Sequence, residues 1–495
     1  MTEAERRRVL DVISKIQAQE PGPASNLKDF LVMPDYSRLR DPDRFLILGG
    51  RGTGKTRVFQ ALTTEHGFSK MIGDQRQLIG PNADNTYILV GYNIGSAFPT
   101  SDILDLLTDE KKARAFWTGS LLICLINANV PNFHFYEIAQ AYLGKDAVEQ
   151  FSSIERLKTP TKWISYIQQN PEKWGLVLDK INESLEQQDH WILVSYDALD
   201  TLTSQYSDLF SFLRPLLSFW HTQSKRWLRL RCKIFLRDDL YKSELLAFPD
   251  ASKLNNCKID LKWNTVSLYR LLIKQMANSG SPEAVAYLRQ IPELISHEPE
   301  SDLGYIPTEQ KNRIEAFVSM LIGTYMGTSP KKGKSYFWFP NHLQDANGVL
   351  SPRPFLKCFR TAAEDMILST DEIAKLQGTQ LLLPSRIQGA LVQVSNERVQ
   401  ELQEEFPWLE ELKSAFSGLT MLMNQQDFID HIDMDLWTDK QKKTLPADSP
   451  RGIFSVLNNL GIVFVANDGR VNVPEIYLHG FHMKRKGGLR RPERE

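Results

Sequence analysis

Residues 49–56 read Gly-Gly-Arg-Gly-Thr-Gly-Lys-Thr and match the pattern GxxxxGK[ST]. The short apolar run 45–48 precedes them, and the segment 57–65, which is typical of a helix, follows. Glycines at this spacing let successive backbone N–H groups point at phosphate oxygens without interference from β-carbons, and the following helix adds its positive N-terminus. The pattern therefore predicts a phosphate-binding loop, the Walker A motif; the alternative is a glycine-rich turn.

The last two residues of this loop have separate predicted roles. The amine of Lys55 would lie near the β- and γ-phosphates of a nucleotide, and the hydroxyl of Thr56 would ligate Mg²⁺. We therefore expect ATP and Mg²⁺ as ligands. The residues predicted to line the nucleotide are Gly50, Arg51, Gly52, Thr53, Gly54, Lys55, Thr56 and Arg57.

A phosphate loop needs a carboxylate from a neighbouring strand to hold Mg²⁺ through its water shell. The apolar run 191–194 leads into Asp197, which is our Walker B candidate; the alternative is an Asp that caps a helix after a buried strand. Many ATPases place a Glu directly after this Asp, but here Ala198 follows. Either hydrolysis is slow, or Asp200 orients or deprotonates the attacking water; a helix N-cap is the alternative role for Asp200.

Two arginines are candidate sensors of the nucleotide. Arg237 ends the next predicted strand, 233–236, where a cation would face the γ-phosphate; the alternative is a surface ion pair with Asp238 or Asp239. Arg353 opens a predicted helix after Pro352 and could reach back over the nucleotide; a capping or surface role is the alternative.

Length and composition indicate a globular protein of several domains. At 495 residues the chain exceeds what one hydrophobic core usually organises. Lys plus Arg (59) nearly balances Asp plus Glu (60), so nucleic-acid binding would need a local basic patch. The apolar runs fall short of the ~20 residues of a membrane span, and the charged start does not resemble a secretory signal. We expect a cytoplasmic protein without disulfides, structural zinc or a membrane partner.

Hydrophobic periodicity divides the chain into an α/β part and a helical part. Strands are predicted at 45–48, 87–90, 191–194 and 233–236, with helices between them and a helical insertion over 111–189. After residue 263, helices are predicted at 264–278, 282–293, 308–326 and 353–366. The predicted domains are an N-terminal helix (1–26), a P-loop core with the insertion (27–262), a helical lid (263–368), a helical linker (369–440) and a winged helix with a basic tail (441–495).

The carboxy-terminal stretch reads as a helix over 452–461 and then two short strands, 462–466 and 470–473, around a turn at Asp468-Gly469. That order favours a winged helix. The tail 484–495 carries six cations and would suit nucleic-acid phosphates, although a solvated end is equally simple.

Together, the Walker A motif, the segments around Asp197 and Arg237, the helix start at Ser351-Pro-Arg353 and the ending 473–488 resemble bacterial P-loop ATPases of the STAND (signal transduction ATPases with numerous domains) and origin-recognition-like AAA+ type. The resemblance implies an ASCE-type P-loop NTPase core with a parallel sheet, a helical lid and a C-terminal winged helix, acting as an ATP-operated switch of the kind found in prokaryotic defence loci. It implies Walker B for Asp197, sensor 1 for Arg237 and sensor 2 for Arg353.

Three functions remain open from the sequence. The first is an ATP-binding and ATP-hydrolysing regulatory switch that controls self-assembly as a homo-oligomer or an effector protein, with anti-phage defence as its setting. The second is a nucleotide-dependent DNA-binding regulator or loader. The third, a small-molecule kinase, would not require two extra helical domains.

Overall fold

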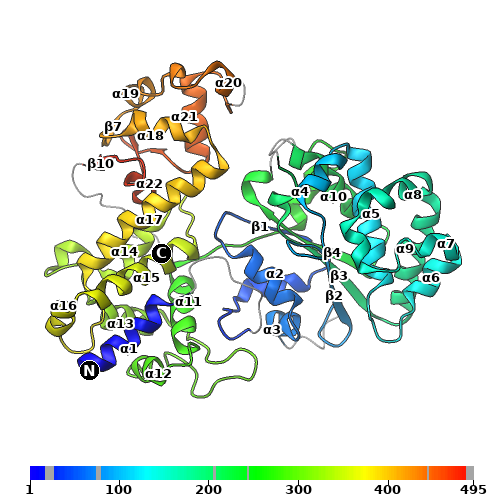
Figure 1. Ribbon diagram of the computed structural model, residues 1–495. Helices are drawn as coiled ribbons and strands as arrows, with labels where there is room; N and C mark the ends of the chain where they lie inside the picture. Colours follow the sequence, from blue (N-terminus) through cyan, green and yellow to red (C-terminus); the bar gives the residue numbers. More distant parts are fainter. Residues whose placement is uncertain (17–26, 74–79, 205–207, 242–244, 443–444, 486–495) are drawn as a thin grey trace. The chain divides into compact units, whose positions relative to one another are not determined.

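The computed structural model describes residues 1–16, 27–73, 80–204, 208–241, 245–442 and 445–485. These residues form two compact units, one from the stretch 21–261 and the other from the N-terminal helix together with residues 262 onward. Figure 1 shows both units and labels their helices and strands where there is room. No helix within the described ranges combines the length and apolar character that a membrane crossing requires.

The first unit is built on a five-stranded sheet with the order β2-β3-β4-β1-β5, in which every pair of neighbours is parallel. All six residues of β3 are buried, as expected for a parallel sheet that is covered on both faces. The strands are β1 (Leu46–Gly49), β2 (Thr86–Tyr92), β3 (Trp191–Tyr196), β4 (Leu230–Arg237) and β5 (Lys258–Asp260). The first four confirm the predicted strands, whereas β5 has only three residues and gave no clear sequence signal.

Helices cover the two faces of this sheet differently. Along β4, Cys232, Ile234 and Leu236 belong to one large apolar cluster, whereas Phe235 points to the other face and packs edge-on against Phe59 of α2. Helix α3 packs with α2, and the other helices of the unit, most of them inserted between β2 and β3, supply the large cluster. The helices are α2 (Lys55–Thr63), α3 (Gly67–Ile72), α4 (Ser101–Leu104), α5 (Glu110–Ile126), α6 (Phe135–Leu143), α7 (Lys145–Val148), α8 (Ile164–Gln169), α9 (Pro171–Gln187) and α10 (Leu209–Gln223).

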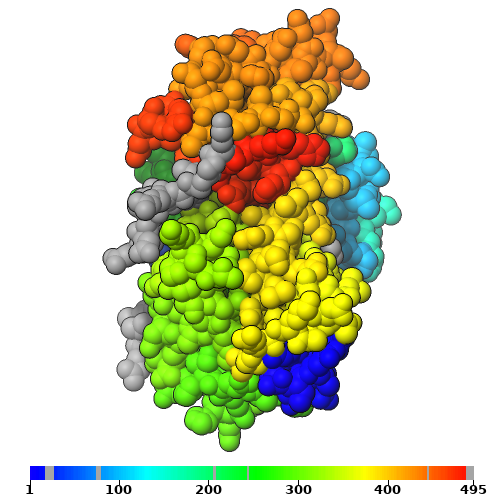
Figure 2. Space-filling view, turned by 90° about the vertical axis from the view of Figure 1, so that its left-hand side faces the viewer, coloured from blue at the N-terminus to red at the C-terminus, as the bar shows by residue number. Residues whose placement is uncertain are grey.

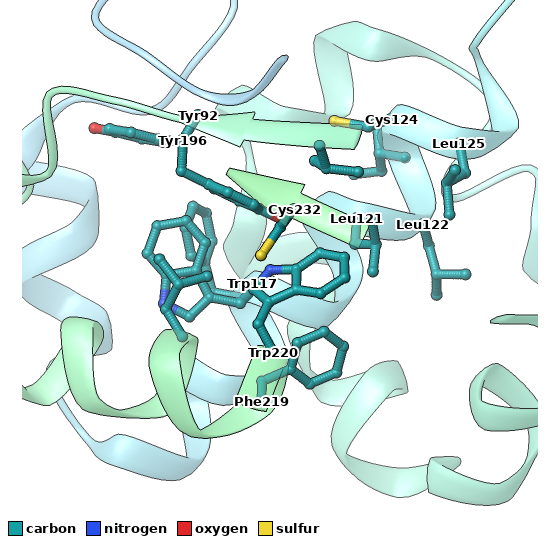
Figure 3. Packing of buried hydrophobic residues seen from close by; sticks show 14 of the residues in the cluster. Tyr92, Trp117, Leu121, Leu122, Cys124, Leu125, Tyr196, Phe219, Trp220 and Cys232 are labelled. Carbon is teal, nitrogen blue, oxygen red and sulfur yellow. The ribbon is translucent and has the colours of Figure 1, made fainter. Parts of the chain in front are cut away.

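The predicted helical insertion is confirmed, and its aromatic residues fix it to the sheet. Trp117 of α5 packs edge-on against Tyr196 at the end of β3, and its indole N–H donates to the carbonyl of Phe212 in α10 (2.8 Å). Figure 3 shows Trp117 and Trp220 beside Cys232 and Tyr196 of the sheet. Since Tyr196 directly precedes Asp197, the insertion supports the strand end that carries the predicted Walker B residue.

A buried lysine holds the start of β1 to β4. The Lys233 amine has no solvent exposure and donates to the carbonyls of Asp41 (2.7 Å) and Arg44 (2.9 Å). Burial lowers the pKa of Lys233 to about 7. The two hydrogen bonds therefore anchor the segment that leads into the phosphate-loop strand.

The second unit is largely helical and includes the N-terminal helix. Arg6 of α1 is buried, and its guanidinium donates to the carbonyls of Gly378 and Gln380 (both 2.7 Å). Figure 2 shows α1, in blue, against the yellow segment that contains α15 and α16. The helices are α1 (Glu3–Ser14), α11 (Thr265–Ala277), α12 (Pro282–Leu288), α13 (Lys311–Ile322), α14 (Ser335–Leu343), α15 (Pro352–Leu368), α16 (Thr370–Lys375), α17 (Pro384–Glu405) and α18 (Leu409–Phe416).

The chain continues into a winged helix, as predicted. A three-stranded antiparallel sheet with the order β7-β9-β8 packs with α19 and α21. Its first strand, β7, comes from a segment that the domain prediction places in the helical linker. The elements are β6 (Thr420–Met421), β7 (Met423–Asn424), α19 (Gln425–Asp430), α20 (Asp439–Lys442), α21 (Pro450–Asn459), β8 (Phe464–Val465), β9 (Arg470–Asn472), α22 (Glu475–Leu478) and β10 (Lys484–Arg485).

The predicted basic tail is described only at residues 484 and 485, which form β10 beside β6. Arg485 donates to the carboxylate of Glu475 (2.6 Å) and to the carbonyl of Val473 (2.5 Å). This cation is therefore committed to the winged helix. The rest of the tail, 486–495, lies outside the described residues.

For two helical glycines of the first unit, we expect substitution by alanine to change the free energy of unfolding in opposite directions. A β-carbon on Gly119 of α5 would lie 2.1 Å from the ring of Trp163, whereas one on Gly175 of α9 would meet nothing within 4 Å. We expect Gly119→Ala to lower the free energy of unfolding by about 1–3 kcal/mol through overpacking, and Gly175→Ala to raise it by up to about 1 kcal/mol through helix propensity. Urea titration of both variants checks this, and equal effects would contradict the packing of α5 on Trp163.

Candidate functional site

The phosphate loop lies at the carboxyl end of β1 and leads directly into α2. Gly52 and Gly54 have φ values of 79° and 92°, in the left-handed region that favours glycine, and Gly54 is the N-cap of α2. A β-carbon on Gly49 would lie 2.5 Å from the Thr53 hydroxyl oxygen. That hydroxyl donates to the carbonyl of Gly50 (2.8 Å). The loop is thus a tight turn at a helix N-terminus, the arrangement that favours an anion.

The Lys55 amine folds back over its own loop. It donates to the carbonyls of Gly49 (2.7 Å) and Gly50 (2.9 Å). Burial lowers the pKa of Lys55, and the nearby carboxylate of Asp200 opposes that shift. A phosphate entering the loop would offer this partly desolvated cation a stronger, charge-assisted partner than a carbonyl.

The structure brings Thr56 and Asp197 together, as the sequence predicts for a magnesium site. Asp197 follows β3, its backbone N–H donates to the carbonyl of Tyr92 (3.0 Å), and Thr56 lies close enough to its carboxylate to affect its pKa. Only 2% of Asp197 is exposed. Burial raises its pKa to about 6, while hydrogen bonds from the Ala198 N–H and Thr56 act in the opposite direction.

These residues fit a magnesium ion. The Oδ2 atom of Asp197 is buried and has no hydrogen-bond partner, an unusual and costly state for a carboxylate oxygen. A hydroxyl and one carboxylate suit Mg²⁺, which usually keeps several waters and takes further oxygens from substrate phosphates. No group of three or more His, Cys, Asp or Glu side chains suited to a metal occurs in the described part of the chain. The fit is therefore to a magnesium that arrives with phosphate.

The backbone is strained directly after Asp197. Ala198 has a φ of 57°, which costs a residue with a β-carbon about 1 kcal/mol or more. This turn leads into the short 3₁₀ segment Leu199–Thr201, which contains Asp200. The residue that directly follows Asp197 thus offers only a methyl group as its side chain.

Arg237 lies beside the phosphate loop, because the register of β1 and β4 pairs it with Gly49. Its guanidinium donates from Nε and Nη2 to the two oxygens of Asp239 (2.9 and 3.0 Å) and from Nη1 to Asp200 (3.4 Å). Arg237 therefore forms an ion pair with Asp239, as the alternative interpretation held, at the edge of the sheet that carries the loop. Its sensor role stays a prediction.

Asp238 belongs to the same group, although the sequence suggested only an ion pair for it. Its Oδ2 atom lies 3.9 Å from where a β-carbon on Gly50 would be. Burial raises the pKa of Asp238, and the charge of Lys55 opposes the shift. The available signal was the acidic pair that directly follows the cation at the end of β4.

Three other predicted residues have ion pairs or positions outside this group of contacts. Arg57, in the first turn of α2, pairs with Asp29 (3.2 Å), and Arg51 is half-buried in the loop. Arg353 belongs to the second unit, where it begins α15 and pairs with Glu401 of α17 (3.5 Å). Its predicted sensor role stays a prediction.

No family model and no curated protein matches the chain. Among solved structures, the ORC2 protein of Aeropyrum pernix in ADPNP-ADP complexes aligns with a TM-score of 0.30 and 12% identity, over 94% of this chain and 99% of that one. The ORC1 protein of Aeropyrum pernix in complex with DNA gives the same TM-score and identity, over 96% and 91%. Likenesses this low carry no argument about function.

Asp197 predicts a pH dependence of stability in the absence of magnesium. Its folded-state pKa of about 6 lies above the ordinary 3.8, so the folded state holds the proton more tightly and stability falls as the pH rises from about 4 through 6. We expect Asp197→Asn to remove that loss, which is on the order of 3 kcal/mol. Denaturant titrations at pH 4.5 and 7.5 in a chelator test this, and parallel losses in both proteins would contradict it.

Proposed function

We propose that this chain is an ATP-binding and ATP-hydrolysing regulatory switch. The observation that supports the proposal is the convergence of Lys55, Thr56, Asp197 and Arg237 on one edge of the sheet, around a loop with left-handed glycines. Each group has a partner in ATP: the amine and guanidinium suit phosphate oxygens, and the hydroxyl and carboxylate suit Mg²⁺.

The chain's own groups can perform hydrolysis by positioning and charge. Mg²⁺, when bound, would supply charge neutralisation of the phosphate oxygens. The Lys55 amine would leave the carbonyls of Gly49 and Gly50 for the terminal phosphates, and Arg237 would stabilise charge that develops on the transferred group. Asp200 is the proposed residue that orients the attacking water. With Ala198 in place of an adjacent Glu, we expect slow turnover, which suits a switch better than a motor.

The switch would act through the second unit. We propose that the helical lid, with Arg353 as sensor 2, and the winged helix respond to nucleotide state and control self-assembly or an effector protein. The predicted setting in anti-phage defence stays a prediction from the resemblance.

A DNA-binding regulator or loader is the alternative function. The described residues of the winged helix give it little support. Arg451 is the one cation of α21, which is described throughout, and Arg470 of the wing is paired with Asp468 (2.6 Å). DNA affinity depends on cations that neutralise phosphates. Steeply salt-dependent binding of duplex DNA by the full chain would revive this alternative.

The nucleotide site predicts a specific role for the Lys55 amine. We expect Lys55→Ala to weaken ATP binding by about 100-fold, the value of two lost charge-assisted hydrogen bonds. Calorimetry with ATP and magnesium measures this. Lys180→Ala is a matched control, because Lys180 is a surface lysine of α9 in the same unit that pairs with Glu183. Unchanged affinity in Lys55→Ala would overturn the proposed site.

The switch also predicts assembly that depends on nucleotide. We expect light scattering after size exclusion to show a larger species with ATP and magnesium than with no nucleotide, and Lys55→Ala to remain in the smaller form. Phosphate release from the same samples reports turnover. A wild-type monomer that binds ATP but keeps its mass would contradict the assembly function while leaving nucleotide binding intact.

A further inference from the structure

The ion pair of Arg237 and Asp239 has a geometry that bears on how ATP is told from ADP. Resting on the proposed nucleotide site, we propose that Asp239 is a positioning residue that holds the guanidinium of Arg237 with its Nη1 edge toward the terminal phosphate. We assign this role to Asp239 because both of its hydrogen bonds are to Nε and Nη2, whereas Nη1 contacts Asp200.

Asp239 occupies one side of the guanidinium completely. Nε and Nη2 donate to its two carboxylate oxygens at 2.9 and 3.0 Å, which is the two-pronged pairing that arginine makes with carboxylates. Nη1 lies on the opposite side of the fork and points to Asp200 at the longer distance of 3.4 Å. The guanidinium is therefore held through two short hydrogen bonds at one edge, and Nη1 makes the longer contact with Asp200 at the other.

The backbone fixes both members of the pair. Arg237 is the last residue of β4 and is paired in register with Gly49, the first residue of the phosphate loop. Asp239 lies in the 3₁₀ turn Asp238–Leu240, whose last residue has no solvent exposure. Because a packed side chain anchors that turn, the carboxylate is held in place while the long arginine side chain is not.

Burial distinguishes this pair from the surface ion pairs of the unit. The side chains of Arg237 and Asp239 are 11% and 18% exposed, whereas Lys180 and Glu183 of α9 are 42% and 51% exposed. An arginine without a partner at such a depth is costly, and exposed pairs contribute little. Asp239 thus keeps a largely buried cation in one geometry before any ligand arrives.

Asp200 occupies the place that an anion would take. Its carboxylate is 36% exposed, and it acts electrostatically on Lys55 as well as pairing with Arg237. Two cations therefore converge on an exposed carboxylate with a long contact, which a phosphate oxygen could replace. Without Asp239, the guanidinium could turn its full fork onto Asp200 and be lost to the ligand.

The test compares ATP with ADP, since only ATP carries the phosphate that Nη1 would face. We expect Asp239→Asn to weaken ATP binding about tenfold, the value of one charge-assisted hydrogen bond, and to leave ADP binding unchanged. In an Arg237→Ala background the same substitution should have no further effect, because a positioning residue acts only through its partner. Asp239→Glu, which keeps the carboxylate, should retain more of the ATP preference than Asp239→Asn.

Asp43→Asn is the matched control. Asp43 pairs with Arg231, a buried arginine at the other end of β4, so its loss removes a carboxylate partner from another arginine of the same strand. It should leave the ratio of ATP to ADP affinity unchanged. Calorimetry on all variants, with urea titration to confirm folding, provides the measurement.

Three results would overturn the inference. Equal losses for ATP and ADP would indicate a merely structural role, full additivity with Arg237→Ala would show that the two residues act separately, and tighter ATP binding in Asp239→Asn would make Asp239 a competitor of the phosphate. A wild-type chain that binds no nucleotide would overturn the proposed function and this inference together. Wild-type ATP binding with an unaltered ratio in Asp239→Asn would overturn only the inference.

Discussion

The pairing of β1 with β4 determines what the first unit can do. These strands are parallel and in register from Leu46 with Ile234 to Gly49 with Arg237. The phosphate loop and the Arg237 side chain therefore lie at the same edge of the sheet. β3 lies on the other side of β4 and delivers Asp197 to the same edge. Ligands bind at the carboxyl ends of parallel strands because loops from separate strands meet there. The strand order thus brings the phosphate loop, the guanidinium of Arg237 and the carboxylate of Asp197 to one edge of the sheet.

The same edge concentrates groups that burial disfavours. Lys55 and Asp197 are both shifted toward their neutral forms by desolvation, and Ala198 occupies a strained backbone region next to them. Packing elsewhere in the unit offsets these costs in folding free energy. The aromatic side chains of the insertion that pack against Tyr196 and β3 contribute most directly. A ligand that brings phosphate and a divalent cation would relieve both desolvated charges at once. This is the physical reason to regard the edge as a binding site.

Local patterns predicted those parts of the molecule that local physics determines. The loop, strands β1 to β4 and the helix α2 follow from glycine spacing and apolar runs, and Asp197 follows from an apolar run that ends in an acid. The three-residue strand β5 exists only because it pairs with β1, and β7 pairs with β9, which lies nearly fifty residues further on. The sequence also left the partner of Arg237 open between Asp238 and Asp239, and it did not suggest Asp200, because that contact depends on how the loops after β3 and β4 meet. Arg353 was placed on a helix start correctly, but its partner Glu401 lies in α17, which no local pattern connects to it.

The residue at 198 constrains how hydrolysis could proceed. A methyl group cannot accept a proton, so in the proposed hydrolysis the group that activates water would have to come from another position at this edge. Asp200 is two residues further on and is exposed enough to meet water, but in this structure it is paired with Arg237. A terminal phosphate that took the place of Asp200 at the Arg237 guanidinium would release Asp200 from that pair. Charge recognition and water activation would then be one event, because a single ion pair has to exchange its anion before either partner can act.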